Sequence, residues 1–156
     1  MRLHIVAVGR LRGGAEAALV ADYRDRAERS GRPLGISAVS VIEVDERKGG
    51  TKAAEAALIG RALPKGATLV ALDERGRELA SPDFAGRIAA WRDGGVQDLA
   101  FVIGGADGLD PALVARADLA LSLGHMVWPH MLARVMLSEQ IYRAMTILAG
   151  SPYHRV

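Results

Sequence analysis

Residues 99–108 read LAFVIGGADG, and residues 119–130 read LALSLGHMVWPH. Each stretch begins with apolar residues typical of a buried strand and then passes into a loop that contains glycine. Glycine lets the backbone approach a ligand closely, and parallel sheets bind ligands at the carboxyl ends of their strands. The two stretches therefore predict a sheet with a ligand pocket at one edge.

The rest of the chain alternates apolar and amphipathic segments. We expect strands at residues 3–8, 36–44, 68–72, 99–103 and 119–123, and helices at residues 15–29, 51–63, 81–91, 111–117 and 130–149. Ser81, followed by proline and aspartate, predicts the N-cap of the third helix. The order of the elements predicts an α/β fold, in which a mostly parallel sheet of five to six strands carries helices on both faces. We expect a single domain over residues 1–156.

The composition excludes several classes of function. The 156 residues include no cysteine, which excludes disulfides, thiolate zinc sites and cysteine nucleophiles. The four histidines and the acidic residues lack the spacing of zinc or calcium sites, so we expect no metal. No apolar run reaches the roughly 18 residues of a membrane span, and the N-terminus lacks the pattern of a signal peptide. We therefore expect a cytoplasmic protein with no membrane partner.

The C-terminal third of the chain is locally basic. Between residues 123 and 156, the arginines Arg134, Arg143 and Arg155 are accompanied by a single acid, Glu139. A basic surface suits a polyanion such as RNA, although an ordinary solvated face could have the same composition. The end of the chain, residues 151–155 (SPYHR), adds a phenol, an imidazole and a guanidinium. Such groups can stack on a base and hold a phosphate.

The last predicted helix is apolar around most of its circumference. Its apolar residues lie at positions 131, 132, 135–137, 141, 142, 145, 147 and 148. This stripe is wider than contact with one sheet requires. We therefore predict a homodimer in which the helix also covers a second copy of the chain. The alternative is a helix that is deeply buried within one chain.

Other catalytic arrangements find less support in the sequence. The glycines of residues 104–108 do not have the spacing of a dinucleotide-binding fingerprint, and neither do those of residues 9–14 after the first strand. Ser122 and Ser138 lack the neighbouring pattern of a hydrolase triad. Asp73 could act as a general base, but an acid at the end of a strand more often accepts hydrogen bonds from a turn.

Motifs along the full length of the chain carry a family resemblance. They are LxxVAVGxL at residues 3–11, LDxxG at 72–76, FVIGGxxGL at 101–109, LS at 121–122, PHxxxRVxxxEQxYRA at 129–144 and PYHR at 152–155. With these motifs in this order, the chain resembles the SPOUT-class methyltransferases, specifically the ribosomal RNA large-subunit methyltransferase H family.

The resemblance implies a fold and an activity. Members of the family use S-adenosylmethionine to methylate N3 of a pseudouridine in the helix 69 loop of 23S rRNA, on assembled ribosomes and as homodimers. Their sheet is followed by a C-terminal trefoil knot, which general rules of chain topology would not predict. We therefore expect a SPOUT fold with this knot. The alternatives are a SPOUT methyltransferase that acts on another RNA nucleotide and a non-catalytic ribosome-binding protein.

The resemblance also implies which residues form the site. The cofactor would contact Leu72, Gly104, Leu123, Gly124, His125, Met126, Val127 and Trp128. The catalytic, substrate-side residues would be Arg143, Tyr153, His154 and Arg155, supported by Glu139 and Tyr142. His154 or a carboxylate would assist the loss of the N3 proton. Methyl transfer from a sulfonium needs no metal and no nucleophilic side chain, so such an enzyme mainly positions two reactants.

Overall fold

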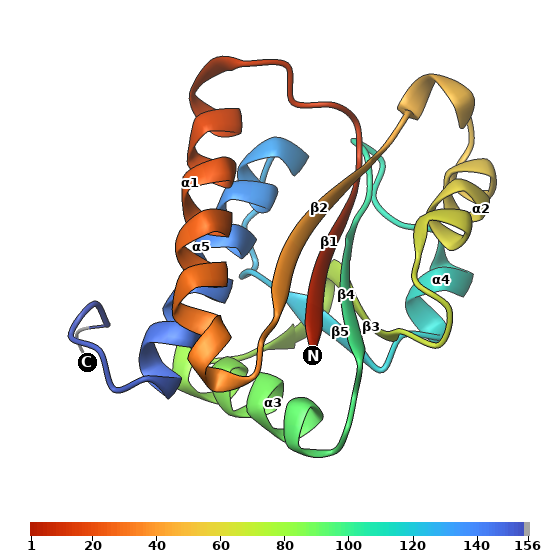
Figure 1. Cartoon of the computed structure of the whole chain (residues 1–156). Helices are drawn as coiled ribbons and strands as arrows, with labels where there is room; N and C mark the ends of the chain where they lie inside the picture. The colour runs from red at the N-terminus through yellow and green to blue at the C-terminus, as the bar shows by residue number, and fades with distance from the viewer. Residues whose placement is uncertain (155–156) are drawn as a thin grey trace.

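A sheet of five parallel strands runs through the middle of the described residues, 1–154, in the computed structural model (Figure 1). Its strands are β1 (Arg2–Val8), β2 (Ala38–Val44), β3 (Thr68–Glu78), β4 (Asp98–Ile103) and β5 (Leu119–Ser122). They lie in the order β2-β1-β4-β3-β5, and every neighbouring pair is parallel. The predicted α/β fold with a mostly parallel sheet is confirmed.

Helices cover both faces of this sheet. One face carries α1 (Gly14–Gly31), α3 (Ser81–Asp93) and α5 (His130–Leu148), and α5 packs against both of the other two. The opposite face carries α2 (Lys52–Ala62) and α4 (Pro111–Ala115). Two short 3-10 helices lie at Arg32–Leu34 and Glu46–Lys48. Within residues 1–154, no helix combines the length and apolar character that crossing a membrane requires.

Strand β4 shows why the sequence forms a doubly covered sheet. All six of its residues are buried. Leu99, Phe101 and Ile103 pack into the core beneath α1, α3 and α5, whereas Ala100 and Val102 pack into the core beneath α2 and α4. Successive side chains of a strand point to opposite faces, so a continuous apolar run fits a strand that is covered on both sides.

Strand β3 is longer than the sequence predicts. It was expected at residues 68–72 but continues to Glu78, because it pairs with β5 twice. Residues 70–72 pair with residues 119–121, and after an irregularity residues 77–78 pair with residues 121–122. Residues 73–76 therefore bend around β5, which is the strand that precedes α5. The trefoil knot itself stays a prediction.

The predicted N-cap at Ser81 is wrong. Helix α3 already includes Ser81, and Ala80 occupies the N-cap position without a side-chain hydrogen bond. The Ser81 hydroxyl instead donates to Gln140 Oε1 on α5, at 2.7 Å. A tertiary partner that the sequence does not reveal has replaced the local one. The bounds of the other helices and strands agree with the sequence predictions to within two residues.

Candidate functional site

A cavity of about 830 Å³ opens at the carboxyl ends of β4 and β5, beside the bend in the middle of β3. Its walls are formed by residues 72–75 within β3, by residues 103–109 at and after the end of β4, and by residues 121, 123, 124 and 126–130 from β5 to the start of α5, with Lys52 and Ala133 completing it. This edge is where parallel sheets bind ligands, and the volume suits a small molecule of cofactor size.

Seven of the eight residues predicted to contact a cofactor line this cavity. They are Leu72, Gly104, Leu123, Gly124, Met126, Val127 and Trp128. The eighth, His125, does not line it: its side chain is 94% exposed, and its Nε2 lies 3.1 Å from a carboxylate oxygen of Glu78. The structure thus gathers residues from three separate segments of the sequence at one place, and the role of each in binding stays a prediction.

Glycines make the walls of the cavity possible. A Cβ atom on Gly104 would lie 2.6 Å from the carbonyl carbon of Gly108, closer than real Cβ contacts allow. The Gly108 N–H donates to the Gly105 carbonyl at 3.0 Å, which closes a tight turn after β4. Gly108 and Gly124 have φ of +78° and +114°, a region that side chains rarely adopt. Both loops therefore present backbone to the cavity.

Charged groups stand at the rim of the cavity. The Asp73 carboxylate accepts hydrogen bonds from the Arg75 backbone N–H and side chain, and the side-chain bond lowers the pKa of Asp73 most. Nearby, burial raises the pKa of Glu55, and the charge of Asp107 adds to the effect. Lys52 and Arg75 line the same cavity, so its rim carries charges of both signs. In residues 1–154, no group of three or more ligating side chains could hold a metal.

Arg134 fixes the start of α5 to the sheet beside the cavity. Its side chain is only 1% exposed, and it donates to Glu43 Oε2 at 2.9 Å and to the carbonyl of Gly9 at 3.0 Å. The same Glu43 oxygen accepts the backbone N–H of Leu11 at 2.7 Å. The sequence marks Arg134 as a charge on an apolar helix, but the distant Glu43 carries no signal that would identify it as the partner.

Exposed apolar side chains surround the mouth of the cavity. Met126 and Val127 are 72% and 80% exposed, and Trp128, Met131 and Leu132 are each close to 40%. Large apolar side chains gathered in this way are typical of a surface that contacts another macromolecule.

The predicted substrate-side residues form a second cluster, at the other end of α5. Glu139 Oε1 accepts hydrogen bonds from Arg143 Nη2 at 2.6 Å and from the Tyr153 hydroxyl at 3.1 Å. The Arg143 guanidinium lies over the Tyr153 ring, 5.1 Å from its centroid, and the Tyr142 and Tyr153 rings are 4.6 Å apart. Burial, and then Glu139, raises the pKa of Tyr153 to about 12.

His154 follows this cluster, and Arg155 lies outside the described residues. The His154 Nδ1 is buried without a hydrogen-bond partner among residues 1–154. The cluster is not at the cavity: Arg143 comes thirteen residues after His130, which lines the cavity, and this corresponds to about 20 Å along an α-helix. Arg143 therefore lies away from this cavity within one chain, whereas Glu139 lines a second cavity together with Leu123 and Gly124.

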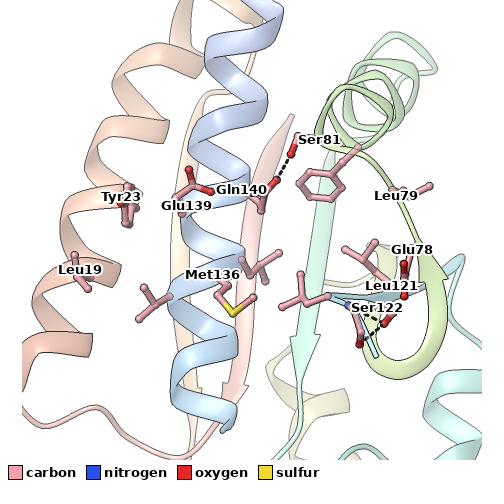
Figure 2. A pocket seen from close by; sticks show the side chains of 15 residues that line it. Leu19, Tyr23, Glu78, Leu79, Ser81, Leu121, Ser122, Met136, Glu139 and Gln140 are labelled. Carbon is pink, nitrogen blue, oxygen red and sulfur yellow. Dashed lines mark hydrogen bonds between the residues drawn. The ribbon is translucent and has the colours of Figure 1, made fainter. Parts of the chain in front are cut away.

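A second cavity, of about 490 Å³, lies between α1, α5 and the end of β3 (Figure 2). Leu19 of α1 and Met136 of α5 give it an apolar side, and Ser122 stands at the end towards β5. Glu139 and Gln140 line its other end, where the Ser81 hydroxyl contacts Gln140. Glu139 is thus shared between this cavity and the cluster around Tyr153.

The chain is similar to known proteins over nearly its whole length. A family model described as "Predicted SPOUT methyltransferase" matches residues 1–154. The chain is 64% identical over 155 residues to a ribosomal RNA large subunit methyltransferase H from Roseobacter denitrificans, covering 99% of both chains. It is 65% identical to one from Cereibacter sphaeroides (strain ATCC 17025), covering all of both. Among solved structures, a probable methylase family protein from Haemophilus influenzae Rd KW20 matches with a TM-score of 0.49 and 14% identity, over 99% of this chain and 70% of that chain.

Proposed function

Because the chain belongs to the SPOUT methyltransferase family, we propose that it methylates the ribosomal RNA of the large subunit with S-adenosylmethionine as the methyl donor. Relatives that are 61–65% identical over nearly their whole length carry the name ribosomal RNA large subunit methyltransferase H. The substrate atom of this proposal is N3 of a pseudouridine in the helix 69 loop of 23S rRNA, in an assembled ribosome. The place of action is then the cytoplasm.

The cavity at the carboxyl ends of the strands suits the donor. Its apolar walls, formed by residues such as Leu72 and Trp128, fit a nucleoside, and Gly104 and Gly124 add backbone surface without side chains. The rim carries both acidic and basic side chains, which suits a donor that has a carboxylate as well as positive charges. When bound, S-adenosylmethionine supplies a methyl group on a sulfonium, so formation of the N–C bond releases a neutral thioether and needs no nucleophile from the protein.

The cluster at the end of α5 provides groups that suit RNA. Arg143 can hold a phosphate, and the rings of Tyr142 and Tyr153 can stack on a base. Tyr153, with a pKa of about 12, stays protonated near neutral pH and therefore donates a hydrogen bond rather than accepting the N3 proton. His154, whose Nδ1 has no partner among the described residues, is our candidate for the proton acceptor. Arg155 completes the proposed substrate side.

A homodimer would bring the two clusters together. About 20 Å of helix separates the cavity from Arg143 within one chain. The exposed apolar residues Met126, Val127 and Leu132 offer a surface for a second copy. We propose that the C-terminal tail of each copy reaches the donor cavity of its partner, so that each site is built from two chains.

The observation that carries this proposal is the cavity in which seven residues from separate segments meet. The decisive experiment incubates the protein with S-adenosylmethionine and either intact ribosomes or isolated subunits, and maps the methylated nucleotide by mass spectrometry. We expect N3-methylated pseudouridine in helix 69 with intact ribosomes. Methylation of a different nucleotide would refute the proposed substrate, and ribosome binding without methyl transfer would indicate a non-catalytic protein.

Calorimetry tests the donor site separately. Trp128→Ala should weaken S-adenosylmethionine binding roughly tenfold, because it removes an aromatic wall from the cavity. His125→Ala is the matched control in the same loop, since its side chain lies outside the cavity. An equal loss of affinity in both variants would contradict this placement of the donor.

A further inference from the structure

A chain of hydrogen bonds connects α3 with the C-terminal tail. The Ser81 hydroxyl at the start of α3 donates to Gln140 Oε1 at 2.7 Å (Figure 2). The Gln140 Nε2 donates in turn to Glu139 Oε2 at 2.9 Å. The other oxygen of Glu139 accepts the hydrogen bonds from Arg143 and Tyr153 described above. All five residues are partly shielded from solvent.

The donor and acceptor groups allow these hydrogen bonds to run in only one direction. A carboxylate only accepts hydrogen bonds, so the end of the Gln140 amide that faces Glu139 must be the NH₂ group. The carbonyl end of the amide then faces Ser81, whose hydroxyl can donate to it. Ser81 thus holds the amide, and the amide holds one oxygen of the carboxylate. The other oxygen is left facing Arg143 and Tyr153.

Without this support, the Glu139 carboxylate would be held at one oxygen only, by Arg143 and Tyr153. The terminal torsion of a glutamate side chain has a broad energy profile, so a free carboxylate rotates easily. A carboxylate that is bonded at both oxygens is held in one orientation. In a partly buried network, such bonds also strengthen one another.

We propose that Ser81 and Gln140 are positioning residues, which orient Glu139 and through it Arg143 and Tyr153 on the substrate side. This inference rests on the proposed function, in which Arg143 and Tyr153 contact the RNA. Neither Ser81 nor Gln140 lines the donor cavity, so binding of S-adenosylmethionine should not depend on them.

The local structure of α3 agrees with this role. Serine at the beginning of a helix ordinarily accepts a hydrogen bond from a backbone N–H of the first turn. Here the hydroxyl instead reaches α5, and α3 begins without a side-chain cap. The position therefore serves the contact between two helices rather than the helix to which it belongs.

The test compares Ser81→Ala and Gln140→Leu with Ser81→Thr, which keeps the hydroxyl. Gln97→Leu is the matched control, because this exposed side chain donates only to the Gly95 carbonyl among the described residues. For each variant, kcat of methyl transfer to ribosomes and Kd for S-adenosylmethionine are measured. The environment of Tyr153 is followed by NMR of ring-labelled tyrosine, which gives few signals because the chain has three tyrosines.

We expect Gln140→Leu to lower kcat about tenfold, since misplaced groups lose catalytic effect steeply. Ser81→Ala should lower kcat less, and Ser81→Thr should restore it. Kd for S-adenosylmethionine should stay within about twofold of the wild-type value, while the Tyr153 signals shift in both Gln140→Leu and Ser81→Ala. Gln97→Leu should match the wild type in all three measurements.

Unchanged Tyr153 signals together with wild-type kcat in Gln140→Leu would overturn the positioning role. So would equal defects in Ser81→Ala and Ser81→Thr. The proposed function fails in a different way, namely if the wild-type protein transfers no methyl group. In that case the tyrosine signals alone still decide whether Ser81 and Gln140 orient the tail.

Discussion

At Gly76 the chain passes β5 so closely that a side chain has no room. A Cβ atom there would lie 2.7 Å from the carbonyl carbon and oxygen of Ala120, which are backbone atoms and cannot turn aside. We expect Gly76→Ala to lower the free energy of unfolding by about 1–3 kcal/mol, the usual cost of overpacking. Urea denaturation followed by circular dichroism measures this change.

Gly86→Ala is the control for that substitution. Gly86 lies within α3, where a Cβ atom would meet nothing within 4 Å. Alanine is the better helix former, so this variant should be more stable than the wild type by about 0.5–1 kcal/mol. A Gly76→Ala protein as stable as Gly86→Ala would mean that residues 73–76 do not bend around β5 as described.

A second residue-scale feature is the charge of Asp98, which lies at the opposite end of the sheet from the cavity. Asp98 is 8% exposed and accepts two hydrogen bonds from Arg2 and one from His4. The other His4 ring nitrogen, Nδ1, lies 2.8 Å from the Ser40 hydroxyl. Together these contacts join β1, β2 and β4. The hydrogen bonds from Arg2 are the largest cause that lowers the pKa of Asp98.

This lowered pKa predicts a pH dependence of stability. The charged form of Asp98 stabilises the fold above the pKa that the group has in the unfolded chain, near 4, and the contribution is lost as the pH falls through the lower folded pKa. Asp98→Asn should therefore lower the free energy of unfolding by about 1–2 kcal/mol at pH 7 and by less at pH 3. Denaturation at both pH values measures it.

Asp25→Asn controls for the effect of removing one charge. Asp25 is exposed and is paired only with its neighbour Arg24 among described residues, so its substitution should change stability little at either pH. If the cost of Asp98→Asn were the same at pH 3 as at pH 7, the ionised carboxylate would not be the source of the stability.

At the scale of elements, the sequence predicts what local patterns determine. The apolar run of β4 and the amphipathic pattern of α1 appear in the structure within two residues of the expected bounds. The second half of β3 does not follow such a pattern. Residues 73–78, DERGRE, are polar and resemble a loop, and they form a strand only because β5 lies beside them. Tertiary pairing of this kind leaves no local trace.

The same division holds for the candidate site. Its glycine loops and the apolar residues 126–128 follow strand ends that are visible in the sequence, and seven of the eight cofactor residues that the resemblance implies line the cavity. The contacts that hold these elements could not be found in this way. Glu43 and Arg134 are 91 residues apart, and Ser81 and Gln140 are 59 apart. Only the folded chain shows which polar side chain has which partner.

Arg134 is the point where α5 is fixed to the sheet. Arg134→Met would keep most of the side-chain volume but would leave Glu43 and two backbone carbonyls without their donor. We expect the free energy of unfolding to fall by about 2–3 kcal/mol, because two backbone carbonyls and the partly exposed Glu43 lose their donor. Urea denaturation at neutral pH measures the change.

Arg143→Met provides the comparison on the same helix. Arg143 is 27% exposed and pairs with Glu139 one turn away, and such pairs contribute about 1 kcal/mol or less. Arg134→Met should therefore lower the free energy of unfolding clearly more than Arg143→Met does. Arg143→Met should lower methyl transfer more than Arg134→Met does. Equal stability of the two variants would show that burial does not strengthen the contacts of Arg134.

At the scale of the whole molecule, α5 is the element that defines where the two halves of the proposed site lie. Its first turn borders the donor cavity, and its last turns carry Arg143 and lead into the tail with Tyr153. A rigid helix keeps these ends about 20 Å apart. Methyl transfer requires the two reactants to be in contact, so the proposed chemistry needs a second chain, arranged so that its tail approaches this cavity.

Mixing two defective variants tests that arrangement. Leu72→Arg places a charged side chain in the donor cavity, and Tyr153→Ala removes the ring that Glu139 and Arg143 hold. Each variant alone should have little activity. When the two are co-expressed in equal amounts, half of the dimers are mixed, and in a mixed dimer one of the two sites combines an intact cavity with an intact tail. We therefore expect about a quarter of the wild-type activity.

If each chain instead served its own cavity, every site in a mixed dimer would carry one defect and the mixture would stay inactive. Mixed dimers purified through two different affinity tags should reach about half of the wild-type activity, which separates restored sites from contamination by either parent.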